Sequence, residues 1–136
     1  MVAKLLKGCR ALIIEDDFYQ AVEIRESLQQ AGAEIVGCRA TVPDLDEMML
    51  RGKIDIALLD INLGNTQSFD FARALNEKGI PVVFLSGYDA SIVPADLQYA
   101  KFISKPANDS DVIAALHQVH SSKPKINGRE SQQIER

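Results

Sequence analysis

Three consecutive carboxylates, Glu15, Asp16 and Asp17, directly follow the apolar run at residues 11–14. Like charges in a partly buried crevice repel each other and are costly to desolvate, so a cation or protonation must offset them. The ligands that these side chains offer are oxygen atoms, which select a hard ion and favour Mg²⁺ with several waters retained. The triplet therefore indicates a metal-binding site.

Three other apolar runs also end in a polar side chain, namely Asp60, Ser86 and Lys105. A hydroxyl and an ammonium group that face a metal-bound carboxylate surround a position that suits a tetrahedral anion, such as a phosphoryl group. Asp60 can then be the nucleophile that forms an aspartyl phosphate. Such a transfer depends mainly on positioning and charge neutralisation, which a divalent ion and Lys105 can supply.

These polar residues need a scaffold that brings them together, and the hydrophobic pattern predicts one. Short apolar runs predict five strands, at residues 11–15, 35–38, 54–60, 81–85 and 101–104. Helical periodicity predicts four helices, at residues 17–31, 43–50 and 67–78 and from about Asn108 onward. Residues 89–97 could form either a short helix or an irregular loop, and the sequence does not decide between them.

Strands that are apolar throughout and alternate with helices predict an α/β fold. We expect a doubly wound, five-stranded parallel sheet with helices on both faces. In such sheets ligands bind beyond the carboxyl ends of the strands, where we expect the polar residues to meet. Asp17 has the spacing of a capping box with Gln20, so we favour it as a helix cap over a metal ligand.

Length and composition limit the possible functions. A chain of 136 residues fits one domain, which we assign to residues 1–121, while the polar residues 122–136 are expected to form a flexible tail. The net charge of −4 argues against nucleic acid as a partner. No apolar run approaches the ~20 residues that cross a bilayer, and the first ten residues lack the apolar region of a signal peptide. We therefore expect no membrane contact. The two cysteines, Cys9 and Cys38, lack metal-ligand spacing, and without a signal peptide they suggest a reducing cytoplasm.

Four motifs stand at the predicted strand ends, and they read IIEDD, LLDINL, FLSG and FISKP. Together and in this order they resemble the receiver domain of two-component response regulators, over residues from about 10 to 120. The resemblance is to the stand-alone, single-domain type, and it implies a flavodoxin-like strand order 2-1-3-4-5. It implies a signalling switch whose only chemistry is Mg²⁺-dependent self-phosphorylation and slow autodephosphorylation, rather than a true enzyme.

The resemblance implies a role for each acidic residue of the metal site. Asp60 matches the phospho-acceptor, while Glu15 and Asp16 match the acidic pair of the family. Asp16 would bind Mg²⁺ directly, and Glu15 would bind it through water. Asn62, two residues past the acceptor, would offer its backbone carbonyl to the ion.

Four further residues match positions of the family. Ser86 matches the hydroxyl that bonds the phosphoryl group, and Lys105 matches the ion-pairing lysine. Pro106 matches a proline that usually follows a cis peptide bond. Phe102 stands where the family has a switching Tyr or Phe, and without a hydroxyl it could switch only by ring packing.

The sequence also departs from the family after the acceptor. Leu63 and Gly64 replace the common Met-Pro, and Ser68 replaces the usual Gly. We therefore expect the loop at residues 64–68 to be looser or differently shaped.

The implied partners are proteins. A histidine kinase or a histidine phosphotransfer protein would donate the phosphoryl group to Asp60. With no output domain expected, a downstream protein would read the face made by the fourth helix, fifth strand and fifth helix, or the chain would act in a phosphorelay.

Two other classes of function compete with this interpretation. A haloacid-dehalogenase-like phosphatase also uses an Asp nucleophile, Mg²⁺ and a Lys, but it requires a carboxylate as acid and base two residues later. Asn62 holds that position and cannot carry a proton, and the chain lacks room for a substrate cap. A degenerate receiver that only binds partners is disfavoured because the acceptor, acidic pair, hydroxyl and lysine are all present.

Overall fold

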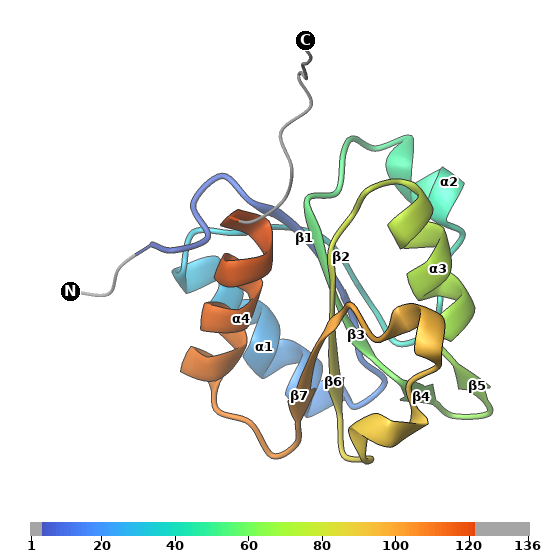
Figure 1. The fold of residues 1–136 in the computed structure, drawn as a ribbon. Coiled ribbons are helices and arrows are strands. Elements are labelled where there is room, and N and C mark those ends of the chain that lie inside the picture. Colours follow the sequence, from blue (N-terminus) through green and yellow to red (C-terminus); the bar gives the residue numbers. More distant parts are fainter. Residues whose placement is uncertain (1–3, 122–136) are drawn as a thin grey trace, which may run out of the picture.

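A five-stranded parallel sheet forms the centre of the computed structural model, which describes residues 4–121 (Figure 1). Its strands are β1 (Arg10–Ile14), β2 (Glu34–Arg39), β3 (Ile56–Asp60), β6 (Val82–Ser86) and β7 (Lys101–Ser104). Their order is β2-β1-β3-β6-β7. This confirms the predicted flavodoxin-like order, while the predicted tail at 122–136 lies outside the described residues.

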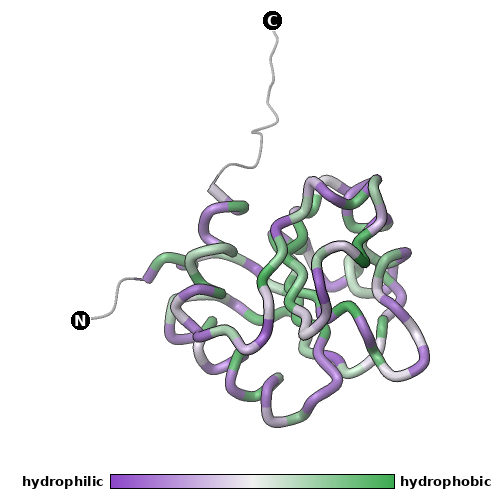
Figure 2. The backbone as a smooth tube through the Cα atoms, turned by 60° about the horizontal axis from the view of Figure 1, so that its bottom comes forward, coloured by the Kyte–Doolittle hydropathy of each residue, from purple (hydrophilic) through white to green (hydrophobic). Residues whose placement is uncertain are grey.

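Helices cover both faces of the sheet, as predicted. Helices α1 (Phe18–Gln30) and α4 (Asp109–Ser121) lie on one face, and α2 (Leu45–Met49) and α3 (Phe69–Glu77) lie on the other (Figure 1). Alternate residues of β1 serve the two layers, because Leu12 and Ile14 pack on the α2 and α3 side whereas Ala11 and Ile13 pack on the α1 and α4 side. Figure 2 shows the hydrophobic segments running through the centre of the molecule. Among residues 4–121, every helix is too short or too polar to cross a bilayer.

The first two helices begin at aspartate caps. Asp17 accepts a hydrogen bond from the Gln20 amide at 3.0 Å, and Asp44 accepts one from the Glu47 amide at 3.1 Å. Asp17 is thus a helix cap, the interpretation that we favoured. In a capping box the Gln20 side chain would accept a hydrogen bond from the Asp17 amide, but here this amide donates to the Glu15 carboxylate at 3.1 Å. Helix α2 is shorter than predicted because Asp44 caps it and leaves Pro43 before its start.

The loop after β3 is a tight hairpin, where the sequence predicted a looser or differently shaped loop. Strands β4 (Asn62–Leu63) and β5 (Thr66–Gln67) pair in antiparallel fashion around Gly64, whose φ of 64° lies in the left-handed region. The predicted helix start at residue 67 was therefore too early, because Gln67 pairs in the hairpin and α3 begins at Phe69.

The segment at residues 89–97 forms two short 3₁₀ helices, η1 (Ala90–Ile92) and η2 (Ala95–Leu97). Pro94 separates them because it lacks an amide hydrogen and disfavours helical backbone at Val93, which has a ψ of 125°. Two 3₁₀ helices therefore stand where the expected surface has its fourth helix, and the elements that correspond to this surface are η1, η2, β7 and α4.

Candidate functional site

Carboxylates from two strand ends meet at the carboxyl edge of the sheet. One carboxylate oxygen from each of Glu15, Asp16 and Asp60 lies within 4.8 Å of the others. Glu15 is buried, Asp16 is exposed, and the Asp60 side chain is 10% exposed. The sheet explains this arrangement, because β1 and β3 are parallel neighbours and both end at this edge. A third neighbouring end, that of β6, carries Ser86.

Lys105 supplies the positive charge of this cluster. Its Nζ donates to Glu15 Oε1 at 2.9 Å and to Asp60 Oδ2 at 3.2 Å. Burial raises the pKa of Glu15, and the hydrogen bonds from Lys105 and the Asp17 amide only partly oppose this. Burial acts to lower the pKa of Lys105, but the hydrogen bonds and charges of Glu15 and Asp60 outweigh it, so this pKa is raised. Lys105 therefore stays protonated beside carboxylates whose charge is poorly solvated.

The backbone fixes Lys105 relative to Ser86. The Lys105 amide donates to the Ser86 carbonyl at 2.8 Å, which ties the ends of β6 and β7 together. The Ser86 hydroxyl is buried and accepts a hydrogen bond from the Tyr88 amide at 3.1 Å. The peptide bond between Lys105 and Pro106 is cis.

Two more residues that the sequence singled out lie on elements that adjoin this cluster. Asn62 begins β4, two residues beyond Asp60, and is partly buried. Phe102 lies in β7 opposite Phe84, where it packs partly buried against the core on the α2 and α3 side.

Ser68 also contacts the site, although the sequence pattern did not indicate this. It is completely buried, and its hydroxyl donates to the backbone carbonyl of Asp60 at 2.8 Å. The predicted helix at residues 67–78 included Ser68, and a single serine at the start of a helix gives no local signal for a contact with Asp60.

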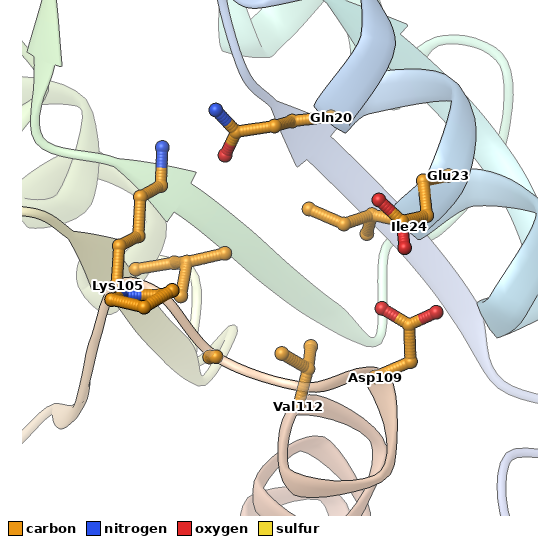
Figure 3. Close-up of a pocket in the computed structure, with 9 residues that line it drawn as sticks. Gln20, Glu23, Ile24, Lys105, Asp109 and Val112 are labelled. Atoms are coloured by element: carbon orange, nitrogen blue, oxygen red, sulfur yellow. The ribbon is translucent and has the colours of Figure 1, made fainter.

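A cavity of about 380 Å³ adjoins the site between α1 and the start of α4 (Figure 3). Lys105 lies on one side of it, and the carboxylates of Glu23 and Asp109 lie on the other. These two carboxylates repel anions, so they disfavour an anion at their end of the cavity.

The donor set fits a hard divalent cation. The three clustered side chains offer carboxylate oxygens alone, and Lys105 offsets only one of their charges. Oxygen ligands at an open, partly exposed edge suit Mg²⁺, which retains several waters.

Comparisons with known proteins agree with this geometry. The model of the family described as "Response regulator receiver domain" matches residues 11–117. The sensory transduction protein LytT of Bacillus anthracis is 26% identical over 118 residues, covering 84% of this chain and 48% of that protein. The chemotaxis protein CheY of Thermotoga maritima is 29% identical, covering 82% of this chain and 98% of that protein.

The fold is also shared with solved structures. The non-phosphorylated HemR receiver domain from Leptospira biflexa superimposes with a TM-score of 0.72 at 25% identity, covering 88% of this chain and all of that one. The chain spans about half the length of several curated relatives that it matches, LytT among them. The family match over residues 11–117, together with the sheet order, shows that the chain belongs to the response regulator receiver domain family.

Proposed function

We propose that the chain is a phosphorylation-dependent signalling switch that accepts a phosphoryl group on Asp60. The observation that carries this proposal is the contact of Lys105 with both Glu15 and Asp60, beside the exposed Asp16. A histidine kinase or a histidine phosphotransfer protein would be the donor. The proposed Mg²⁺ ligands are Asp16 and Asp60 directly, Glu15 through water, and the backbone carbonyl of Asn62.

In the transfer, an Asp60 carboxylate oxygen attacks phosphorus while the bond from phosphorus to the donor nitrogen breaks, and the imidazole leaves with that electron pair. Bound Mg²⁺ would neutralise charge on the phosphoryl oxygens. Lys105 holds the acceptor carboxylate and is near enough to donate to a phosphoryl oxygen. Ser86 lies at the adjacent strand end, where its hydroxyl can donate to another oxygen.

The same step can act as a switch. A phosphoryl group adds close to two negative charges at this edge. We expect the Ser86 hydroxyl to turn toward the new oxygens, which would open space into which the ring of Phe102 rotates. The two residues lie on the neighbouring strands β6 and β7. A downstream protein would then read the altered face of η1, η2, β7 and α4, or the phosphoryl group would pass along a relay.

We propose that the chain works in the cytoplasm, with proteins rather than nucleic acid or membrane as partners. The net charge of −4 supports this because phosphate-rich partners require a basic surface.

A haloacid-dehalogenase-like phosphatase remains the alternative. It would require a proton-carrying group at Asn62 and a pocket for the alcohol part of its substrate. The neighbouring cavity is lined by Glu23 and Asp109, which disfavours an anionic ester there.

Two phosphate donors distinguish these functions. Phosphoramidate contains the same type of phosphorus–nitrogen bond as phosphohistidine, whereas p-nitrophenyl phosphate is a monoester. We expect uptake of at most one phosphoryl group per chain from phosphoramidate with Mg²⁺, and no sustained release of nitrophenol. Many turnovers on the monoester that depend on Asp60 would instead identify a phosphatase.

A further inference from the structure

Ser68 uses its hydroxyl differently from the cap residues of other helices in residues 4–121. Asp17 and Asp44 each accept a hydrogen bond from an amide of the helix that follows, whereas Ser68 makes no such side-chain bond to α3. Its hydroxyl instead donates to the Asp60 carbonyl at 2.8 Å, and its amide donates to the Ile61 carbonyl at 2.9 Å. Ser68 thus holds two successive peptide groups immediately after the acceptor.

These two bonds close the base of the β4–β5 hairpin. Within the hairpin, Asn62 pairs with Gln67, and Leu63 pairs with Thr66. The Thr66 hydroxyl also donates to the Leu63 carbonyl at 3.2 Å. The segment that leaves Asp60 is therefore fixed at its base and along its length.

The bond to the Asp60 carbonyl constrains the direction of the acceptor carboxylate. Strand β3 fixes the backbone before the Asp60 α-carbon, and Ser68 fixes the carbonyl just after it. The side chain branches from this α-carbon, so its direction toward Lys105 depends on both constraints. The bond is also durable, because Ser68 is completely shielded from competing water.

We infer that Ser68 is a positioning residue for phosphoryl transfer, which fixes the peptide group of Asp60 and thereby aims its carboxylate. This inference rests on the proposed function. At this position the chain has Ser68 in place of the glycine that is usual in the family. The backbone does not require glycine here, because the φ of −88° at Ser68 is accessible to any residue.

The experiment compares initial rates of phosphorylation by acetyl phosphate in the unmodified chain and the variants Ser68→Ala, Ser68→Cys and Ser27→Ala. Ser68→Ala removes the hydroxyl, while Ser68→Cys keeps a side chain of similar size with a weak donor. Ser27→Ala is the matched control, because the Ser27 hydroxyl bonds to Asp109 between α1 and α4 and is part-buried. Rates are measured at saturating Mg²⁺ over a range of donor concentrations, at a temperature where circular dichroism shows each variant folded.

We expect both Ser68 variants to lose at least about tenfold in maximal rate, because small displacements of reacting groups can cost up to about a hundredfold. The donor concentration for half-maximal rate should stay unchanged, since the donor contacts are retained. Ser27→Ala should lower the melting temperature and leave the rate unchanged. If Ser68→Ala does not fold, Ser68→Cys alone decides.

Two results would overturn the inference while leaving the proposed function intact. One is a folded Ser68 variant that phosphorylates at the unmodified rate. The other is a loss of rate that follows the loss of melting temperature equally in the Ser68 and Ser27 variants. Absence of phosphorylation in the unmodified chain would instead overturn the proposed function, and the inference with it.

Discussion

The ammonium nitrogen of Lys105 lies 2.9 Å from Oε1 of Glu15, although 90 residues separate the two in sequence. Glu15 is buried and Lys105 is 20% exposed at its side chain, so the pair is only partly screened by water. The same nitrogen also contacts Asp60. Lys105 therefore contacts two acidic residues but supplies only one positive charge, which leaves net negative charge for a metal ion to neutralise.

Replacing Lys105 should show how much its positive charge contributes to stability. We predict that Lys105→Met lowers the free energy of unfolding by about 1–3 kcal/mol without Mg²⁺, because it leaves the buried carboxylates of Glu15 and Asp60 without their cationic partner. Mg²⁺ should stabilise the variant more than the unmodified chain, since the competing cation is gone. Urea denaturation with and without Mg²⁺ measures both effects.

Lys53→Met is the matched control for this change. Lys53 lies 3.7 Å from the buried Asp55 but is 76% exposed, so its removal should cost much less. Equal stability of Lys105→Met and the unmodified chain would contradict the prediction.

Neighbouring aspartates should respond differently to metal. We predict that Mg²⁺ stabilises the folded chain and so raises its melting temperature. At a Mg²⁺ concentration a hundredfold above Kd, the added free energy of unfolding is about 2.7 kcal/mol. Asp16→Asn should lose most of this response. Asp17→Asn should keep it, because Asp17 caps α1 and asparagine caps equally well. Thermal unfolding across a Mg²⁺ titration tests the pair, and equal loss in both variants would place Asp17 among the ligands.

The left-handed turn of the hairpin should prefer glycine. Gly64 has a φ of 64°, and a β-carbon there would meet nothing within 4 Å, so strain is the only cost of a side chain. We predict that Gly64→Ala lowers the free energy of unfolding by about 1 kcal/mol and that Gly64→Asn lowers it less. Chemical denaturation of both variants gives the comparison. A stabilising effect of alanine would show that the hairpin has another conformation in solution.

Acid should weaken the attachment of η2 to α3. Arg73 on α3 bonds to Asp96 through Nε at 2.7 Å, and this hydrogen bond holds the pKa of Asp96 below its ordinary value of 3.8. A lowered folded-state pKa means that the stabilisation is present above pH 3.8 and is lost as the pH falls through the lowered value. The effect should be small because the group is exposed to solvent.

Asp96→Asn isolates this contribution. The variant should be less stable than the unmodified chain at neutral pH, and the difference should shrink below pH 3.8. Urea midpoints measured at several pH values test this. A difference that stays constant down to low pH would show that the ion pair is not its source.

The sequence allowed the sheet and the main site to be predicted because both depend on strong, local signals. Strands β1, β3 and β6 each contain an unbroken apolar run. A side chain that is out of place in a core ends or directly follows each run, as Asp60 ends β3 and Glu15 follows β1. Parallel strands place these ends at one edge whatever the details of the helices.

The parts that were missed depend on weaker or longer-range effects. The hairpin at residues 62–67 involves only two residues in each strand, which is too short for a periodic pattern. A proline such as Pro94 can either end a helix or begin one. The sequence does not distinguish these cases, which depend on the extended backbone that Val93 has in the folded chain. The contact of Ser68 with Asp60 was missed because the bond spans eight residues and depends on the hairpin between them.

Intact-protein mass spectrometry after incubation with acetyl phosphate measures directly whether Asp60 accepts a phosphoryl group. We expect the unmodified chain to gain the mass of a single phosphoryl group when Mg²⁺ is present and to gain none when a chelator removes it. Asp60→Asn should gain none in either condition. Persistent uptake by Asp60→Asn, or equal uptake with the chelator, would contradict the assignment of Asp60 as a metal-dependent phosphoryl acceptor.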